Sequence, residues 1–555
     1  MPANTPKANA DALLQLARER FEDLTQAEEA MVRAAGDGTI ANCTLGESDT
    51  DPAHAEQWSE HRVIRADRIA WLCTEADASA RVSHHGIQVK AARIEGELDL
   101  RDAEVGFSLY FESCAVLNRI NLHGAQVKNL YLPGTHTRAL KADGLKVGGP
   151  VLLRNGFKAD GEVRLVGATI GSNLECDASE FTKPEGYALI AAGVKVDGDV
   201  FLRNAFKAQG QVCLLGATIG GALDCQKGEF TNRDGKALNA AQIKVGQSVF
   251  LHRGFKARGG VSLRGASIGG PLDCEKGEFN NPNGDALSAD GIKVDGAVYL
   301  RDGFKAVGRV DFARADVGGL QWHDVAEPAS AKLDLRSARI GVLWDDEASW
   351  PESGNLYLQG LVYAELGIDA PTDAERRKRW LRLQPRFTPQ PYEQLAKVLR
   401  ESGHEDDAKE ILIAKNQERA KTLSWRRRAG YWLFGVTTGY GYRPWLALAW
   451  LLLIMCIGWA LFAVGFATGA MACTKKTDDY RPKPCALIYS ADTFIPLINF
   501  HQADYWTPDA AKIVHIWRLA IPVGSVLCLY FWCHILFGWI LTTLLVVGLT
   551  GMIRA

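Results

Sequence analysis

The chain has 555 residues, with 63 Lys and Arg against 65 Asp and Glu and a formal net charge of −2. This balance argues against a dedicated nucleic-acid binder, which carries a basic excess or a basic face, and against an acidic DNA mimic. The length exceeds what one compact core holds and predicts about two or three domains. The composition is that of a soluble protein up to about residue 430, after which apolar and aromatic residues dominate.

The N-terminal 85 residues predict a helical cap. Residues 8–35 are amphipathic at helical spacing and predict one helix, and residues 63–76 predict a second helix packed beside it. The chain begins without a basic segment followed by an apolar run, so we expect no cleaved secretory signal. The soluble part is therefore expected to stay in the cytosol.

A long repeat follows this cap. Its units begin at Ala139, Ala188, Ala237 and Ala286, 49 residues apart, and contain PVLLRNGFKADG, DVFLRNAFKAQG, SVFLHRGFKARG and AVYLRDGFKAVG. The first three units continue with GATIGSNLEC, GATIGGALDC and GASIGGPLDC. Self-similarity at a fixed period is typical of one structural unit stacked on copies of itself.

Each repeat predicts two coils of a parallel β-solenoid. Short runs alternate apolar and polar residues, as in Val200–Leu202, and glycines separate the runs every few residues. Degenerate coils on both sides extend the solenoid over residues 86–368. About eleven or twelve coils at about 4.8 Å each predict a rod about 55 Å long.

Residues that recur in register form rows along such a rod. The recurring cysteines lie two coils apart, about 10 Å, too far for a disulfide or a shared metal, so we interpret them as buried core thiols. The recurring lysines are a candidate row for an anionic ligand, polymer or lipid headgroup, although a solvated face is the favoured interpretation. The glutamates are expected elsewhere on the coil. The rows are Cys176, Cys225 and Cys274; Lys158, Lys207, Lys256 and Lys305; and Glu180, Glu229 and Glu278.

Residues 369–430 predict a helical connector. The segment 392–421 predicts a helical hairpin turned at Ser402-Gly403, and it resembles a single tetratricopeptide-type unit that serves as a connector or a docking surface. The basic cluster Arg426–Arg428 directly precedes the apolar region, as expected of a cytoplasmic flank.

Residues 431–555 predict a transmembrane domain with two spans, 444–467 and 519–552. We expect a multi-pass protein of the bacterial inner membrane, with the solenoid and both termini cytoplasmic. The loop between the spans would then be external, where Cys473 and Cys485 are a candidate disulfide.

Polar residues in this domain are the candidate functional residues. His534 lies within the second span, where a titratable group is costly, so it either has a functional role or forms a hydrogen bond between helices. The segment Thr437–Gly441 matches the sequence motif of a potassium selectivity filter but precedes the first span, so we interpret it as an interfacial turn. Asp492 and Thr493 belong to a short apolar, helix-like stretch at 488–496 between the spans, and they are candidate pore residues.

This stretch and the following GWILTTLLVVGLTGMIR resemble the two-helix ion-channel superfamily, which places a pore helix and filter between two spans. The resemblance covers about ninety residues, and Leu497–Phe500 stands where the filter glycines belong. The whole arrangement resembles a group of uncharacterised bacterial membrane proteins with pentapeptide-like solenoids, some labelled "membrane-associated oxidoreductase". The features that carry this second resemblance are WLCTEA, the GATIGG-type coils, YEQLAKVLRESGHEDDA, GYGYRPW and DTFIP…GWILTT.

Three hypotheses follow. The first is a membrane-tethered, non-enzymatic scaffold whose solenoid binds a protein or envelope partner. The second is a channel gated through the solenoid, which requires a homo-oligomer because two spans cannot enclose a pore. The third is an oxidoreductase, implied only by the family label, since the chain lacks GxGxxG, CxxC and haem or iron–sulfur spacing. We expect a lipid bilayer and a protein as partners, and no nucleic acid, cofactor, metal or catalytic residue.

Overall fold

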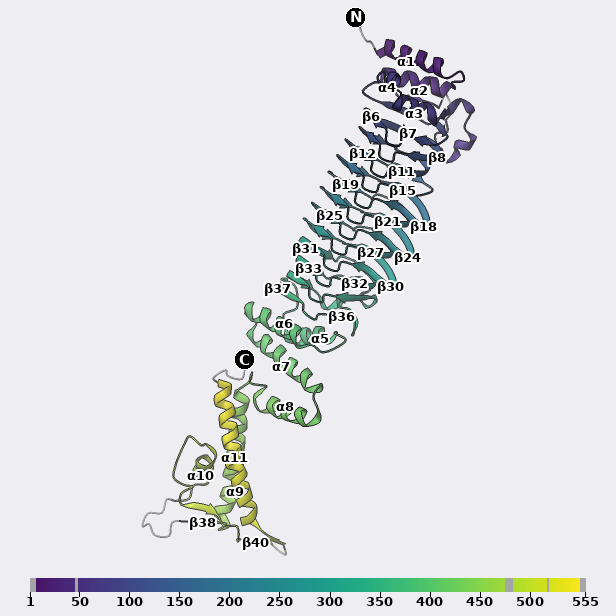
Figure 1. Cartoon of the computed structure of the whole chain (residues 1–555). Helices are drawn as coiled ribbons and strands as arrows, with labels where there is room; N and C mark the ends of the chain where they lie inside the picture. Colours follow the sequence, from purple (N-terminus) through teal and green to yellow (C-terminus); the bar gives the residue numbers. More distant parts are fainter. Residues whose placement is uncertain (1–5, 45–47, 475–482, 517–518, 550–555) are drawn as a thin grey trace. The chain divides into compact units, whose positions relative to one another are not determined.

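The computed structural model of the chain describes residues 6–44, 48–474, 483–516 and 519–549 (Figure 1). The chain divides into two compact units, Met1–Gly403 and His404–Ala555. The first unit contains a parallel β-solenoid of about 12 turns, which confirms the predicted fold class.

Coils of the repeat alternate between two lengths. In register, Thr169 pairs with Lys195 and Lys195 pairs with Thr218, so successive coils take 26 and 23 residues and together make the 49-residue period. All strand pairs within the solenoid are parallel, and they build two long sheets. One sheet holds the two-residue strands β16 (Thr169–Ile170), β17 (Leu174–Glu175), β19 (Lys195–Val196), β20 (Val200–Phe201), β22 (Thr218–Ile219), β23 (Leu223–Asp224), β25 (Lys244–Val245), β26 (Val249–Phe250), β28 (Ser267–Ile268) and β29 (Leu272–Asp273).

The other sheet holds the longer strands, and their lengths follow the coil lengths. The three 11-residue strands belong to the long coils, and the seven-residue strands between them belong to the short coils. This sheet contains β8 (Ala115–Asn121), β11 (His136–Lys141), β18 (Glu180–Ile190), β21 (Lys207–Cys213), β24 (Glu229–Asn239), β27 (Lys256–Ser262), β30 (Glu278–Ser288) and β32 (Lys305–Asp311). Towards the end of the solenoid the first sheet also lengthens, in β31 (Lys293–Leu300), β33 (Asp316–Trp322), β35 (Arg339–Asp345) and β37 (Val362–Leu366).

The core of the solenoid is a set of stacked side-chain rows. One phenylalanine per coil is fully buried, and consecutive ring centroids lie 5.2–5.8 Å apart, a spacing that suits aromatic pairs. The recurring cysteines Cys176, Cys225 and Cys274 are fully buried, and burial raises the pKa of each thiol. They are core residues, as predicted. The phenylalanine row is Phe157, Phe181, Phe206, Phe230, Phe255, Phe279 and Phe304.

The N-terminal cap differs from the prediction of one helix over residues 8–35. The structure has two helices, α1 (Pro6–Arg20) and α2 (Gln26–Asp37). Thr25 begins the second with a capping box, in which its hydroxyl accepts from the Glu28 amide and the Glu28 carboxylate accepts from the Thr25 amide. A capping box satisfies the free amides of a helix start, so it fixes the start of a second helix at this point.

The second predicted cap helix is shorter than expected. Val63–Arg65 forms strand β2, which pairs with β4 (Arg93–Glu95), and α3 begins only at Ala66 and runs to Thr74. Helix α4 (Ala76–Ser79) follows. The pairing with β4 extends the sheet edge, which overrides the helical pattern of the first three residues.

Two helices follow the last coil within the first unit, α5 (Ala374–Arg382) and α6 (Pro389–Glu401). Arg377 of α5 is fully buried and pairs with Asp345 at the end of β35, with both guanidinium-to-carboxylate hydrogen bonds at 2.8 Å. The Trp350 indole also donates to Asp345. This end of the solenoid is therefore closed by a buried, bidentate ion pair.

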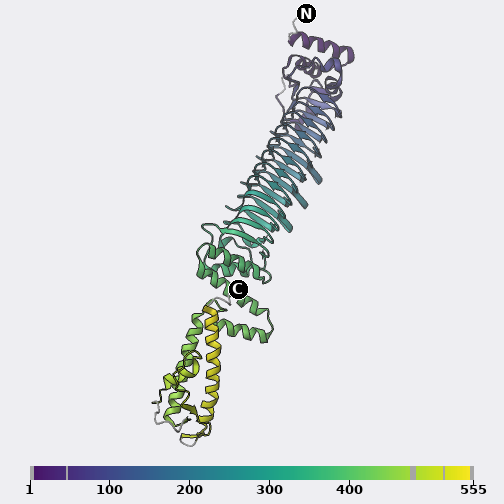
Figure 2. The same ribbon diagram turned by 60° about the vertical axis from the view of Figure 1, so that its left-hand side comes forward.

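The second unit contains the apolar helices. It consists of α7 (Glu405–Lys421), α8 (Trp425–Thr438), α9 (Trp445–Ala467), α10 (Ala486–Phe494) and α11 (Val523–Leu549), with two antiparallel ribbons, β38 (Met471–Cys473) with β39 (Trp506–Pro508) and β40 (Val514–Ile516) with β41 (Leu519–Ile521). By length and composition, α9 and residues 523–547 of α11 can cross a membrane. Figure 2 shows α9 and α11 running alongside each other, in agreement with their contacts.

The predicted second span, 519–552, begins too early. Leu519–Ile521 is a strand, and the helix begins at Val523, directly after Pro522. Proline lacks an amide hydrogen and is favoured at a helix start, which accounts for the boundary. Residues 550–552 lie outside the described part of the chain. The interpretation of Thr437–Gly441 as a turn is confirmed for its second half, because α8 ends at Thr438 and a turn follows, with Gly439 in the left-handed conformation. Its interfacial position remains a prediction.

Candidate functional site

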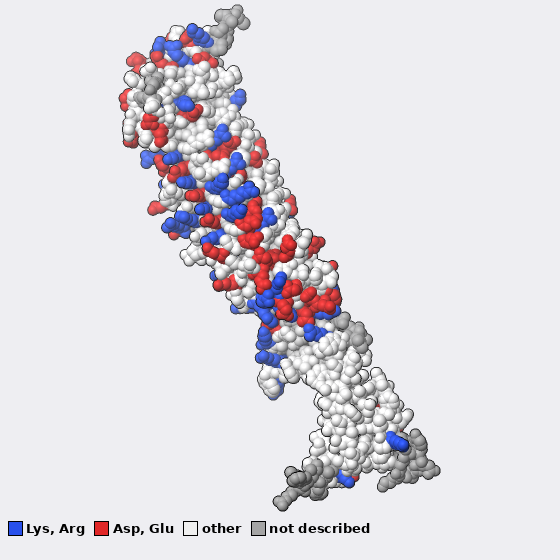
Figure 3. All heavy atoms as spheres, turned by 180° about the vertical axis from the view of Figure 1, so that it is seen from behind, with Lys and Arg blue, Asp and Glu red and all other residues white. Residues whose placement is uncertain are grey.

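The lysine and glutamate rows of the solenoid form a single row, contrary to the expectation that they occupy different parts of the coil. In register, Lys158 pairs with Glu180, Glu180 with Lys207, and Lys207 with Glu229, and the alternation continues through Lys256 and Glu278 to Lys305. The 49-residue spacing concealed this, because it compares only every second coil. Figure 3 shows acidic and basic side chains interspersed along the solenoid.

This alternation bears on the candidate anionic-ligand row. The Lys158 and Lys256 ammonium groups lie 4.0 and 3.9 Å from the Glu180 and Glu278 carboxylates, and Lys305 lies 2.6 Å from Glu327. Each lysine therefore has a carboxylate one coil away, and the row offers no continuous positive stripe. Binding of an anionic ligand to these lysines remains a prediction.

A second outer row shows how one position varies from coil to coil. Arg154 pairs with Glu175 at 2.6 Å and Arg203 with Asp224 at 2.7 Å, while the equivalent His252 pairs with Asp273 at 3.0 Å. His252, Asp273 and Glu275 are close enough to hold a metal ion. Protein cations already occupy this cluster, because Arg301 lies 3.6 Å and Arg253 4.0 Å from Glu275. The arrangement continues the ion-pair row.

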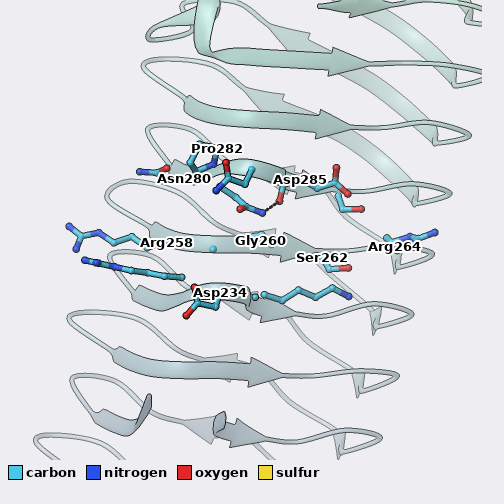
Figure 4. A pocket seen from close by; sticks show the side chains of 17 residues that line it. Asp234, Arg258, Gly260, Ser262, Arg264, Asn280, Pro282 and Asp285 are labelled. Atoms are coloured by element: carbon cyan, nitrogen blue, oxygen red, sulfur yellow. Dashed lines mark hydrogen bonds between the residues drawn. The ribbon is translucent and has the colours of Figure 1, made fainter. Parts of the chain in front are cut away.

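A large groove on the solenoid was not anticipated from the sequence. It has a volume of about 910 Å³ and lies over β27, between the projecting loops of β24 and β30 (Figure 4). Arg233, Arg258, Lys236 and Arg264 line it together with Ser262. A comparison of the repeats could have indicated it, because Gly260 stands where the neighbouring repeats carry Gln211 and Arg309.

His534 lies at the centre of the second unit and is fully buried. Its Nε2 atom lies 3.2 Å from the hydroxyl and from the carbonyl oxygen of Ser490 in α10, and its Nδ1 atom lies 3.1 Å from the Tyr530 hydroxyl. The Ser490 hydroxyl also donates to the Met455 carbonyl of α9. Gly458 allows this approach, since a Cβ there would lie 2.5 Å from the His534 ring and the Ser490 hydroxyl.

This hydrogen-bond network joins α9, α10 and α11. Both ring nitrogens of His534 have neutral partners, and the ring stacks on Phe494 with centroids 4.5 Å apart. The geometry favours the hydrogen-bonding interpretation of His534, since the contacts fix α10 between α9 and α11. A role in transport remains a prediction.

Asp492 and Thr493 lie on α10 but have other partners. The Asp492 carboxylate accepts from the backbone amides of Phe500 and Ala503, and so shapes the loop after the helix. The Thr493 hydroxyl donates to the Tyr489 carbonyl within its own helix. The described hydrogen bonds of Asp492 and His534 therefore go to different groups, although both residues belong to the same helical assembly.

The candidate disulfide partners lie at the ends of two elements. Cys473 is the last residue of β38 and Cys485 immediately precedes α10, and both are half-buried. Their pairing remains a prediction.

No family model matches the chain, and neither the curated proteins nor the solved structures contain a match to it. Fold and chemistry define its class: a β-solenoid protein with two helices able to cross a membrane.

Proposed function

We propose that the chain is a membrane-anchored scaffold whose solenoid presents a repetitive flank to a partner protein. The observation that carries this proposal is the pairing, in one chain, of an uninterrupted solenoid of about 12 turns with two apolar helices long enough to span a bilayer. Extended repeat surfaces commonly serve as binding surfaces. The core rows repeat with little change, while some outer positions vary, as from Arg203 to His252 and from Gln211 to Gly260. Such variation outside a constant core suits recognition of a partner.

We further propose that the helices lie in the bacterial inner membrane with the solenoid on the cytoplasmic side. The support is the exposed cluster Arg426–Arg428 in the first turns of α8, at the edge of the apolar region. A fluorescent protein that folds only in the cytosol, fused to the N-terminus of the full chain, should fluoresce. Absence of fluorescence with normal expression would reverse the orientation.

Site-specific photocrosslinking in cells tests the scaffold proposal. A photoreactive phenylalanine analogue is placed at Tyr187 or at Asn283, which are exposed on the long coils. In membrane fractions both positions should crosslink the same partner, so the mass added to the chain should be equal for the two. The same analogue at Lys195 or Lys244, exposed on the other sheet, is the matched control and should not crosslink that partner. Release of the chain from membranes by alkaline carbonate, or no product with the analogue at Tyr187 or Asn283, would overturn the proposal.

A pore is the second candidate, and one observation favours it. Helix α10 is fixed between the two apolar helices, and the loop after it exposes Leu497 (78% exposed) and Phe500 (49% exposed). Exposed apolar residues at that place suit contacts between protomers of an oligomer. Ion flux into liposomes containing the full chain, abolished by Asp492→Ala, is the result that a pore requires.

A further inference from the structure

The groove over β27 is a consequence of the alternating coil lengths. In the long coils, residues 232–235 and 281–284 project as loops, and the strand register skips them on the neighbouring short coils. Gly259 has a φ of 120°, and a Cβ on it would lie 2.1 Å from the Asn232 carbonyl oxygen. Gly210 and Gly308 occupy the same place in their coils with φ of 118° and 120°. Glycine at this position lets each loop fold down onto the next coil.

The residue after that glycine decides whether the space between the loops is filled. Gln211 and Arg309 carry long side chains at this position, whereas Gly260 has none and leaves the floor bare (Figure 4). Ser262 lines the same groove and is 1% exposed, and its hydroxyl has no hydrogen-bond partner among the described residues. A buried polar group without a partner is costly, and a ligand in the groove can supply the missing hydrogen bond.

The charges around the groove favour an anionic ligand. Arg258 lies at one end of the groove and Arg264 at the other (Figure 4). Arg233, two residues after the register partner of Arg258, and Lys236, the register partner of Gly260, also line it. Among the described residues, Arg233, Arg258 and Lys236 make no ion pair, whereas Arg264 pairs with Asp290 at 3.2 Å. Two carboxylates, Asp234 and Asp285, also line the groove, which leaves an excess of cations. Neighbouring unpaired guanidinium groups are suited to bind carboxylates in pairs of hydrogen bonds.

The width of the groove points to an extended polypeptide. Strands β24 and β30 lie two coil spacings apart, about 9.6 Å, so the gap between their loops accommodates one extended strand. The register of β24 and β30 skips residues 232–235 and 281–284 on the adjacent short coils, and backbone outside the strand register is where an added strand can pair. The seven-residue floor of β27 matches a segment of about six residues.

We propose that this groove binds an acidic segment of the partner protein in extended conformation, with its carboxylates on the four cations that line it, Arg233, Lys236, Arg258 and Arg264. The inference rests on the proposed scaffold function and assigns the surface and the chemistry of the partner. It concerns one coil of the repeat, because only there does glycine stand at the position of Gln211 and Arg309.

Fluorescence anisotropy with the full chain in nanodiscs and fluorescein-labelled hexaglutamate as the probe tests the proposal. Saturable binding that weakens with added salt is expected for the native chain. Gly260→Gln fills the floor with the side chain that an adjacent repeat already carries at this place, and it should weaken binding about tenfold or more. The double variant Arg233→Ala/Arg258→Ala should do the same without changing the floor.

The control is Lys195→Ala/Lys244→Ala, which removes the same charge from exposed positions on the other sheet and should change affinity less than about twofold. Equal loss in this control would show non-specific attraction and overturn the site, as would hexaglutamate binding unchanged by Gly260→Gln and by the arginine variant. Tighter binding of tetragalacturonate than of hexaglutamate would overturn the assignment to a polypeptide. If the native chain crosslinks a partner at Asn283 but does not bind hexaglutamate, the partner segment is not acidic. That result would overturn the proposed ligand and leave the scaffold function intact.

Discussion

The solenoid and the apolar unit use polar side chains in opposite ways. Along the repeats of the solenoid, charged side chains pair across coils outside the apolar core, as Arg203 does with Asp224, and the buried pair of Asp345 with Arg377 lies at its end. In the second unit, His534 lies fully buried among neutral partners, Ser490 on another helix and Tyr530 on its own. In the solenoid, polar side chains form ion pairs that recur from coil to coil. In the second unit, they form hydrogen bonds that join helices in an apolar surrounding.

The difference separates positions that are free to vary from positions that are fixed. Arg154, Arg203 and His252 share one place in successive repeats, and the buried rows beside them are unchanged. An outer residue of the solenoid can therefore acquire a binding role without disturbing the core. Replacing His534, in contrast, affects three helices together. This contrast supports the proposal that recognition occurs on the solenoid and that the polar residues of the apolar helices have a structural role.

The largest effect is expected where the solenoid itself buries a charge. Asp345→Ala leaves the fully buried Arg377 without its partner and should lower the free energy of unfolding by about 3–5 kcal/mol. Urea unfolding of the full chain, followed by the circular dichroism of the β-sheet, measures this. The double variant Asp345→Leu/Arg377→Met should recover most of the loss, and a loss under about 1 kcal/mol for Asp345→Ala would contradict the account.

A smaller effect is expected at the centre of the apolar unit. His534→Leu removes the hydrogen bonds to Ser490 and Tyr530 and should destabilise this unit by about 0.6–2 kcal/mol, since a hydrogen bond between membrane helices contributes about that much. Unfolding in bicelles by steric trapping measures it, with Cys533→Ala as the neighbouring control. Unchanged stability together with lost ion flux would instead assign His534 to transport.

Acidification should weaken a particular outer ion pair. Hydrogen bonds from Arg314 lower the pKa of Asp290 below its ordinary 3.8, so the stabilisation is present above about pH 4 and is lost as the pH falls through the lowered pKa. Asp290→Asn should therefore cost about 1 kcal/mol at pH 7 and progressively less below pH 4. Urea unfolding across this pH range checks it, and a difference that grows on acidification would contradict the assignment.

The smallest effect is expected in the alternating lysine and glutamate row. Lys256 and Glu278 are 3.9 Å apart and about half exposed, so a double-mutant cycle with alanine should give a coupling energy of about 0–0.5 kcal/mol. Unfolding at low and at high salt measures it. A coupling above about 1 kcal/mol that resists salt would show that this row stabilises the solenoid more than surface ion pairs do.

The architecture was predictable because its causes are local and repeated. Alternating apolar residues and glycines specify short strands, and each unit repeats the same core positions, including Cys176, Cys225 and Cys274. Uncharged stretches long enough to cross a bilayer specify α9 and α11 in the same direct way. The break in the first cap helix was also present in the sequence, as the capping box from Thr25 to Glu28, but the amphipathic pattern concealed it.

The candidate surfaces required information that the repeat period does not contain. Placing Glu180 between Lys158 and Lys207 requires the separate lengths of the two coils, 26 and 23 residues, and a period gives only their sum. The groove at Gly260 depends on which residue of one coil lies between loops of its neighbours. Of the partners of His534, Tyr530 lies one helical turn away, but Ser490 lies 44 positions away in the chain, a distance over which no local pattern acts.

The protomer count of the full chain in lipid nanodiscs, measured by mass photometry, tests the central claim that the membrane helices anchor and the solenoid recognises. The account predicts a monomer or dimer that conducts no ions in liposomes. A uniform tetramer or larger ring with ion flux that depends on Asp492 would contradict it, because two spans per chain enclose a pore only in such a ring.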